Sequence, residues 1–515
     1  MVVSQLASPL RLPNFSSVAS VRSAPAGTGD GYTAASEDPA SRPTSIEKTA
    51  LLRLFQDPGS LSPQPGGSRQ MADYDGRVKH LALMLSSYAR SGRMREQVLD
   101  AYKTLFNRME PDTKFSIIVD SNRDKADVQR AIAESGCPNP ERIQLVQPGV
   151  GDLTVWARDM MVGLEFPGSP DRTALLAQKP LHDWHGNDRE VPIFLSHAAP
   201  GVHLNMAKRL VTDGGDTTSN RSDSFVGHYS IAATAERLQQ AFSDESVRMA
   251  GIRYFETTTG KTVVPGALPY KLQPVDTGDL HRMPIQIVEN PTYRKPDLKE
   301  GQATEGEMYE YLAARMFERE FGKPVTVLGA DDPSTPDHRE EPACDHMDMG
   351  FTPISDNEVL LGDPGLARQL LDSMTPAEKK QAEEKLSEVA GKPVRLEDYF
   401  GPGLRNRDNQ EDFEAYKRIA EEKNLSVTRM PHLEPGGGLP YISYNNCLME
   451  RFEKDGQEVR RVFLPVYGVE KLDNYAITTW QSKGFEVIPM ELGALSAYWG
   501  ALRCISNWME RSPSA

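Results

Sequence analysis

The sequence predicts an α/β fold, because short apolar runs typical of buried strands alternate with helical segments that have clear start and stop signals. The strand-like runs lie at 115–119 (FSIIV), 143–146 (IQLV), 325–328 (VTVL), 358–361 (EVLL), 462–466 (VFLPV) and 485–489 (FEVIP). The 515-residue chain is 38% hydrophobic and 25% charged, which is the composition of a globular protein with a large core. This length is compatible with one domain or two.

Helix boundaries are marked at several points along the chain. Thr304 and Glu307 form a capping-box pattern ahead of a helix at 308–321, which Gly322 ends. Further helices are predicted at 74–107, 126–135, 376–390, 411–423 and 471–483. The order of strand, helix and strand recurs without an exact sequence period, which indicates repeated short structural units.

The two ends of the chain differ in composition. Residues 1–70 are predicted to be a disordered tail or a secretion leader, since this segment is rich in Ser, Ala and Pro and has no acidic residue before Asp30. It has no apolar core of a Sec signal, so a type III-like route or a transit peptide are the alternatives to a plain tail. Residues 71–515 are predicted to be one folded domain with insertions near 170–200, 220–300 and 365–430.

Charge and cysteine content exclude several classes of function. A formal net charge of −15 repels phosphate backbones, so nucleic acid is not an expected partner. No stretch approaches the roughly 18 apolar residues that span a bilayer. The four cysteines lie far apart without a CxxC pair, which favours a reducing compartment, the cytoplasm, over a disulfide scaffold.

A histidine and a carboxylate stand close together in the segment 345–348 (DHMD). In an extended segment, alternate residues face the same side, so His346 and Asp348 can share one pocket. Such a pair can transfer protons and hold a cation. An HxD pattern alone says little, and a surface-loop histidine is the competing interpretation.

Cys504 lies in a segment of small residues near the C-terminus, 492–507 (LGALSAYWGALRCISN). Adjacent Arg503 supplies positive charge that favours a thiolate. The competing interpretation is a buried structural cysteine, because free cysteine is among the most buried residue types. On composition alone, Cys344 and Cys447 are rival nucleophiles.

Two further segments carry carboxylates beside aromatic residues or glycines. Trp156 and Asp159 belong to the segment WARD, and Asp213 and Asp216 flank a glycine pair in DGGD. Each segment alone is typical of a turn or a salt bridge. Their order along the chain, followed by HxD and a late cysteine, is more specific.

This ordered set resembles the guanidino-group-modifying enzymes of the pentein fold, which include arginine, agmatine and peptidylarginine deiminases, dimethylarginine hydrolases and amidinotransferases. The resemblance runs from about residue 150 to the C-terminus and includes HMDMGFTPI with EVLLGDP, and YNNCLMERF ahead of RVFLPVYG. It departs from the agmatine deiminases at Met160 and Met161, where those enzymes have Gly-Pro. The resemblance implies an α/β propeller of about five ββαβ-like units around a central site.

The resemblance also implies a role for each candidate residue. Cys504 would be the nucleophile and His346 the general acid and base, while Asp159 and Asp348 would grip the guanidinium. The other candidates are Asp213 and Asp216, which would orient the histidine or line the entrance, and Trp156.

The chemistry fits these residue types. A guanidinium keeps its charge because its pKa exceeds ~12, and carboxylates can bind its planar nitrogens bidentately. The expected reaction is hydrolytic deimination, converting peptidyl-arginine to citrulline with release of ammonia through a covalent amidino-thioether on Cys504. The expected substrate is an arginine-containing protein or a small guanidino compound.

Alternatives remain open at this point. If an amine replaced water in the second step, the same residues would transfer the amidino group. A metal-dependent hydrolase could instead use Cys344, His346 and Asp348 as ligands, and an inert scaffold that only binds partners is a third possibility. The oligomeric state is not predicted.

No cofactor or metal is expected. The acidic stretch 334–348 is compatible with calcium but lacks the spacing of a calcium loop, and an HxxH pattern at 182–185 lacks a third ligand nearby. The glycine run 436–438 lacks the Lys-Ser/Thr of a phosphate loop and is expected to be a turn.

Overall fold

The computed structural model describes residues 44–512, except for 65, 90–91, 170–171, 182–185, 275–284, 295, 331–341, 345, 402–408 and 435–438. The expected N-terminal tail therefore falls largely outside the described residues. Within 1–70, however, the structure places helix α1 (Ser45–Leu54) and the short strand β1 (Arg69–Gln70). A capping box at Thr44 starts α1, and Leu51 and Leu54 are buried.

Among the described residues, five sheets share one strand order. Two antiparallel strands are followed by one or more helices and then by a third strand parallel to the second. In the first sheet, β22 (Ser506–Arg511) pairs with β2 (Val78–Leu85), and helix α2 (Gly92–Arg108) connects β2 to β3 (Lys114–Val119). Helix α3 (Asn122–Ser135) then connects β3 to a further strand, β4 (Ile143–Val146). The second contains β5 (Met161–Glu165), β6 (Thr173–Lys179), helix α4 (Val191–Ala198) and β7 (Val202–Val211).

The remaining three sheets repeat this order with longer helical connections. In the third, β8 (Thr217–Ser219) pairs with β9 (Ser224–Gly227), and β9 pairs with β14 (Val325–Leu328). The connection from β9 to β14 includes the helices α5 (His228–Ala241), α6 (Glu245–Thr259) and α7 (Glu305–Phe321). The fourth contains β15 (Phe351–Pro353), β16 (Glu358–Asp363), helices α8 (Pro364–Asp372), α9 (Pro376–Ala390) and α11 (Gln410–Glu422), β17 (Ser426–Leu433) and β18 (Ile442–Ser443). The fifth contains β19 (Leu448–Lys454), β20 (Gln457–Val466), helix α12 (Glu470–Ser482) and β21 (Glu486–Glu491).

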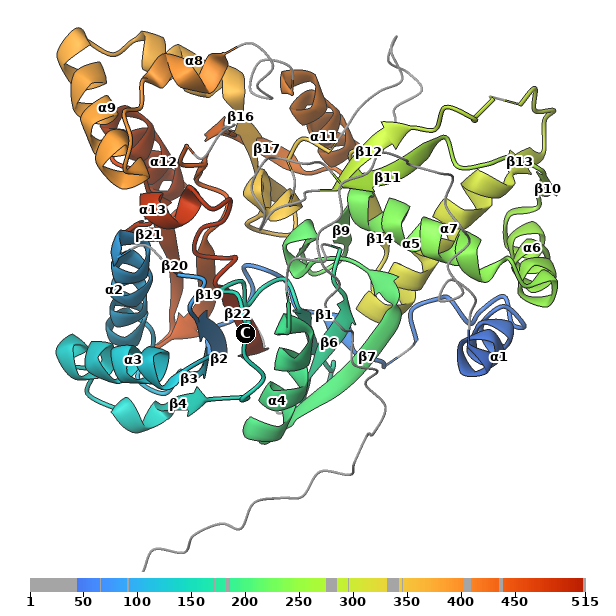
Figure 1. Ribbon diagram of the computed structural model, residues 1–515, viewed down its shortest axis with the longest axis horizontal. Helices are drawn as coiled ribbons and strands as arrows, with labels where there is room; N and C mark the ends of the chain where they lie inside the picture. The colour runs from blue at the N-terminus through green and yellow to red at the C-terminus, as the bar shows by residue number, and fades with distance from the viewer. Residues whose placement is uncertain are drawn as a thin grey trace, which may run out of the picture. The chain divides into compact units, whose positions relative to one another are not determined.

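The last strand of the chain completes the first sheet. β22 runs antiparallel to β2, with Leu81 opposite Trp508 and Leu83 opposite Ser506. Figure 1 shows β22 near the middle of the folded part, with α2 and α3 to its left and α5 and α7 to its right. The pairings establish a mixed α/β fold with several sheets, and the hydrogen bonds of the described strands do not form one continuous closed ring.

The structure corrects two expectations. The apolar residues of 74–107 do not all belong to a helix, because 78–85 is the strand β2, in which nearly every side chain is buried, and α2 begins only at Gly92. A strand buried on both faces has no alternating pattern, so its apolar residues also occur at the spacing typical of a helix. The segment 170–200 is not an insertion either, since it supplies β6 and α4 of the second sheet.

Other expectations about local structure are confirmed. The capping box at Thr304 starts α7, and Gly322 ends it with a left-handed φ of 64°. The helix α9 begins at Pro376 after a capping box at Thr375 and ends at Gly391. β10 (Thr262–Val264) pairs with β13 (Gln302–Thr304), β11 (Tyr270–Pro274) pairs with β12 (Ile285–Glu289), and α9 lies in the connection of the fourth unit. The insertions near 220–300 and 365–430 stay predictions. No described helix combines the length and apolar character that crossing a bilayer requires.

Trp508 is a central buried residue of β22. The guanidinium groups of Arg158, Arg503 and Arg511 lie 4.6, 4.8 and 4.6 Å from the centre of its ring, and all three arginines are buried. An aromatic face attracts a cation, so one indole helps to hold three charges in the interior. Arg503 and Arg511 flank Trp508 near the C-terminus, whereas Arg158 precedes β5, so Trp508 links the first sheet to the segment that leads into the second.

Replacing Trp508 with Leu is expected to lower the free energy of unfolding by ~3 kcal/mol or more, because the buried ring and its cation–π contacts are lost. Trp508→Phe keeps an aromatic face and is expected to lose less. Urea unfolding followed by circular dichroism measures both. A Leu variant within about 1 kcal/mol of the unmodified protein would contradict this role.

Candidate active site

The candidate residues occupy equivalent places in the repeated units. Asp159, Asp216, Asp348 and Cys504 each lie one to three residues before the first strand of a unit, namely β5, β8, β15 and β22. Asn446 holds the same place before β19. Because the N-terminal ends of these first strands lie close together, residues far apart in the sequence meet in one cluster. The short turns η5 (Gly214–Asp216) and η6 (Met347–Met349) also pack against each other.

His346 lies between two of the predicted carboxylates. Its Nε2 is 3.3 Å from Oδ2 of Asp213, and its Nδ1 is 3.7 Å from Oδ1 of Asp159. The other oxygen of Asp213 accepts a hydrogen bond of 2.8 Å from the backbone N–H of Leu181. Asp213 is thereby fixed in place, and it can hold the imidazole in one orientation.

The glycine pair of the DGGD turn is required by close packing. A Cβ on Gly215 would lie 2.6 Å from Nδ1 of His346 and 3.1 Å from Oδ1 of Asp159. A Cβ on Gly214 would lie 2.1 Å from the backbone oxygen of Arg158. The turn therefore approaches both site residues at a distance that no other amino acid allows without movement.

Asp348 is fully buried and already has two partners. Its Oδ2 accepts a hydrogen bond of 2.9 Å from Nε of Arg503, and its Oδ1 accepts one of 3.1 Å from the side chain of Asn446. Burial raises the pKa of Asp348, while the guanidinium of Arg503 acts in the opposite direction. Each carboxylate oxygen has a second lone pair that can accept a hydrogen bond from a guanidinium, so these contacts are compatible with the predicted role of Asp348 in substrate binding. That role stays a prediction.

Asn446 was missed by the sequence reasoning, although its side chain contacts both the thiol and one of the predicted carboxylates. Its amide nitrogen lies 3.2 Å from Sγ of Cys504 as well as 3.1 Å from Asp348. Its amide oxygen accepts hydrogen bonds of 3.1, 3.0 and 3.3 Å from the backbone N–H groups of Ala501, Arg503 and Cys504. One side chain therefore holds the turn that carries the thiol.

Asp216 is held by partners other than those of Asp213. Its Oδ2 accepts hydrogen bonds from the backbone and the hydroxyl of Ser230. Burial raises the pKa of Asp216 to about 7, against the effect of these hydrogen bonds. A Cβ on Gly227 would lie 1.9 Å from Oδ1, so this glycine leaves the room that the carboxyl occupies. The observed contacts of Asp216 support the inner end of α5.

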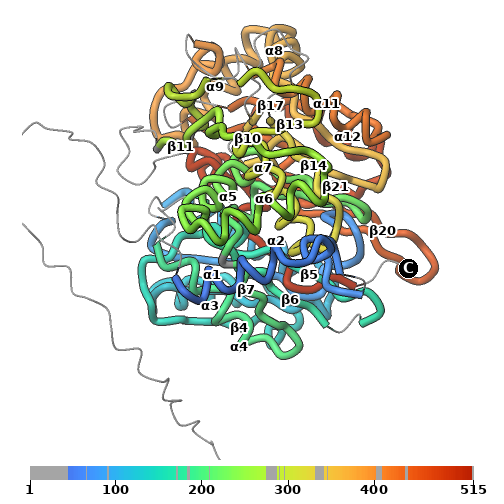
Figure 2. Tube along the Cα trace, turned by 90° about the vertical axis from the view of Figure 1, so that its right-hand side faces the viewer, coloured from blue at the N-terminus to red at the C-terminus, as the bar shows by residue number. Residues whose placement is uncertain are grey.

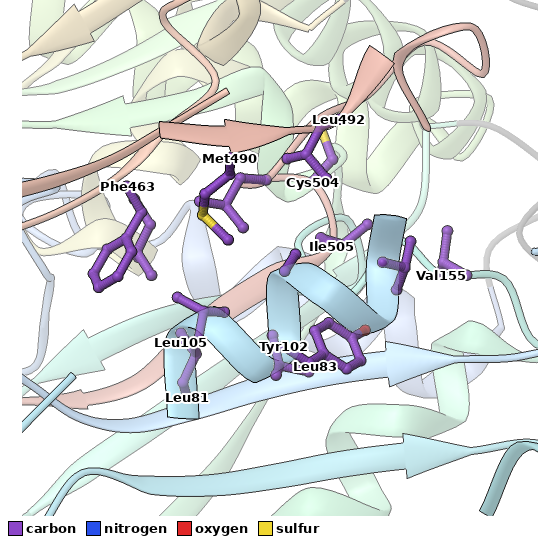
Figure 3. Packing of buried hydrophobic residues seen from close by; sticks show 14 of the residues in the cluster. Leu81, Leu83, Tyr102, Leu105, Val155, Phe463, Met490, Leu492, Cys504 and Ile505 are labelled. Carbon is purple, nitrogen blue, oxygen red and sulfur yellow. The ribbon is translucent and has the colours of Figure 1, made fainter. Parts of the chain in front are cut away.

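Trp156 packs beside the thiol. A Cβ on Gly500 would lie 2.5 Å from the Trp156 ring and 3.0 Å from Cβ of Cys504, so both residues border the same glycine. The ring of Tyr88 meets the ring of Trp156 edge-on at 5.9 Å. Trp156 and Cys504 belong to one hydrophobic cluster, and Figure 3 shows Cys504 next to Leu492 and Ile505 within it.

The protonation states follow from burial and charge. Burial raises the pKa of the Cys504 thiol to about 11, and the carboxylate of Asp348 acts in the same direction. Burial alone would lower the pKa of His346, but the carboxylates of Asp159 and Asp213 and the contact with Cys504 raise it well above its usual value. At neutral pH the resting site therefore holds a neutral thiol beside an imidazolium.

The rival nucleophiles have other surroundings. Cys344 is fully buried, and its Sγ lies 4.0 Å from the backbone oxygen of Met347. Cys447 is buried with its pKa raised to about 12, mainly by burial. Within the described part of the chain, no group of three or more His, Cys, Asp or Glu residues could hold a metal ion. The HxxH pattern at 182–185, the glycines 436–438 and most of the acidic stretch 334–348 lie outside the described residues.

Alkylation of Cys504 tests the high pKa of its thiol. Because the thiolate reacts and the thiol does not, the rate of iodoacetamide labelling of the native protein is expected to rise about tenfold per pH unit between pH 7 and 10. Mass spectrometry of the Cys504 peptide measures this rate separately from the other cysteines, and Cys504→Ser identifies the peptide. A labelling rate that levels off below pH 8 would show that the resting thiol is already ionised.

Comparison with known proteins adds the following. No protein-family model matches the sequence, and no curated protein matches it. Solved structures with similar chains include an agmatine deiminase from C. jejuni, at 11% identity over 86% of this chain and 96% of that chain with a TM-score of 0.47. The agmatine deiminase of Enterococcus faecalis is similar at 12% identity over 88% and 98%, with a TM-score of 0.48. DDAH from Pseudomonas aeruginosa is similar at 10% identity over 84% and 99%, with a TM-score of 0.31. These neighbours are members of the pentein superfamily that the sequence resembles.

Proposed function

We propose that the chain is a guanidino-group hydrolase with a pentein-type α/β propeller fold. The observation that carries the proposal is the buried cluster in which the Cys504 thiol and the His346 imidazole meet three carboxylates, those of Asp159, Asp213 and Asp348. A thiol, an acid–base group and a surplus of negative charge are the parts that attack on a cation requires. The five repeated strand orders support the fold.

The carboxylates provide the site for the substrate. A guanidinium would be bound by Asp159 and Asp348, whose charges a planar cation can satisfy through paired hydrogen bonds. Arg503 and Asn446 already hold Asp348, which keeps its carboxyl group in a fixed orientation for the incoming cation. Fixed groups lower the entropic cost of positioning the reacting carbon against Cys504.

Binding of the cation would also activate the nucleophile. The pKa of Cys504 is raised mainly by burial and then by Asp348, so neutralising these carboxylates with a bound guanidinium removes part of the repulsion against a thiolate. Because His346 is already protonated, the thiol proton would be released to solvent as the site takes up the cation, and the thiolate sulfur would attack the guanidinium carbon. The new C–S bond gives a tetrahedral intermediate.

His346 would then act twice. As an imidazolium it donates its proton to the leaving nitrogen, the C–N bond breaks, and ammonia departs from an amidino-thioether on Cys504. As a neutral base it then takes a proton from water, whose oxygen attacks the same carbon. Breaking the C–S bond releases the ureido product and returns the sulfur as a thiol. Asp213 would maintain the orientation of the ring through both steps.

We propose peptidyl-arginine as the substrate and citrulline as the product. The connections of the third and fourth units add elements that a minimal ββαβ unit does not need, including β10 to β13 and α9. Such additions favour a substrate larger than a free amino acid. The wide spacing of the cysteines, all four of which are buried, supports a reducing working compartment, the cytoplasm.

Incubation with free arginine, agmatine and an arginine-rich protein tests the reaction and the substrate together. A colour assay for ureido groups is expected to respond, and mass spectrometry is expected to find about one dalton gained per arginine, since an NH is replaced by oxygen. Cys504→Ser is expected to lose at least ~1000-fold in rate, while Cys344→Ser keeps its activity. Amidino transfer to added glycine without a ureido product, or loss of activity to chelators, would contradict the proposal.

The close approach of Gly215 provides a second test. Gly215→Ala is expected to lower kcat by ~100-fold or more, because its Cβ displaces His346 and Asp159 from the geometry that proton transfer needs. Gly92→Ala is the matched control, because a Cβ at Gly92 would have no neighbour within 4 Å. Steady-state kinetics of both variants measure the effect. Equal activity of the two variants would show that the DGGD turn does not position the histidine.

A further inference from the structure

A cavity of about 910 Å³ lies away from the cluster around Cys504. It is bounded by α1 and the turn that follows it, by Arg209 of β7 and by Arg319 at the end of α7. Figure 2 views the folded part from the side on which α1, β7 and α7 lie. Ile46, Ala50 and Leu54 of α1 form an apolar part of the wall.

The charges that line this cavity are mostly positive. Arg53, Arg209 and Arg319 face one carboxylate, that of Asp57, in a chain whose formal net charge is −15. Arg209 is half-buried, and burial and then the neighbouring Arg319 lower its pKa, while the carboxylates of Glu320 and Glu47 act in the opposite direction. Two like charges held together cost free energy, and an anion bound between them would recover it.

The nearby carboxylates already have partners. Glu320 forms a long ion pair of 3.9 Å with Nε of Arg319. Asp57 accepts a hydrogen bond of 2.9 Å from the backbone N–H of Gly59. Glu47 takes part in the capping box of α1 and lies 3.4 Å from Arg237. Over the described ranges, Arg209 forms no ion pair within 4.0 Å, so its guanidinium can accept an external anion.

We infer that this cavity binds the phosphate group of a small phosphate ester. Guanidinium groups bind phosphate through paired, charge-assisted hydrogen bonds, and Arg209 and Arg319 would provide them, with Arg53 at the rim. The volume exceeds that of a single phosphate and falls in the range of small-molecule sites. The apolar wall of α1 would contact the organic part of the ester. This inference concerns binding and does not depend on the proposed reaction.

Calorimetric titration tests the site with three probes, namely inorganic phosphate, pyrophosphate and ADP. ADP is expected to bind the full chain more tightly than inorganic phosphate does. Arg209→Gln and Arg319→Gln are each expected to weaken ADP binding about tenfold or more, the effect of losing one charge-assisted interaction. Arg189→Gln is the matched control, because Arg189 is exposed and lies outside the cavity.

Each result bears directly on the inference. Absence of binding by all three probes up to about 10 mM would overturn it. Binding of inorganic phosphate without tighter binding of ADP would overturn the assignment to an ester, and unchanged ADP affinity in both Gln variants would overturn the location. If the variants fail to fold, hydrogen exchange of the unmodified protein replaces them. ADP is then expected to protect the peptides of α1 and β7, and protection confined to other peptides would contradict the site.

Discussion

The rest of the site depends on the ion pairs of the buried Arg503 guanidinium with Asp348 and Asp73. This guanidinium bonds to Asp348, to Asp73 at 3.0 and 3.1 Å, and to the backbone oxygen of Thr217 at 3.1 Å. These partners come from the fourth sheet, the segment before the first sheet, and the third sheet, while Arg503 itself directly precedes Cys504. Removing one partner of such a buried pair costs ~3–5 kcal/mol, so the position of the thiol and the association of the sheets are coupled.

The surroundings of Cys504 favour the neutral form of its thiol. Burial and the carboxylates hold the proton on Cys504 and keep His346 charged, so the isolated site has little nucleophilic character at neutral pH. A cation among the carboxylates changes this balance in the direction of the thiolate. The proposed substrate would thus itself favour the Cys504 thiolate that attacks it, which limits the reaction of this cysteine with other electrophiles.

Much of the fold and of the site could be predicted from the sequence, because the information was local. Glycines and capping boxes marked helix ends, and WxxD, DGGD, HxD and the late cysteine identified residues that the structure brings together. Asn446 was missed because an amide has no titratable chemistry, and its partners are the backbone of a turn about 55 residues away. Its place just before a strand, shared with the other four segments, was the available signal. Asp73 could not be predicted, since it meets Arg503 across 430 residues.

Detection of the covalent intermediate tests the central claim most directly. The protein would be mixed with an arginine-containing substrate, quenched with acid during turnover, digested and analysed by mass spectrometry. The account predicts an amidino group on the peptide that contains Cys504 and on no other cysteine peptide. Formation of ureido product with the Cys504 peptide unmodified, together with retained activity of Cys504→Ser, would contradict the assignment of this residue as the nucleophile.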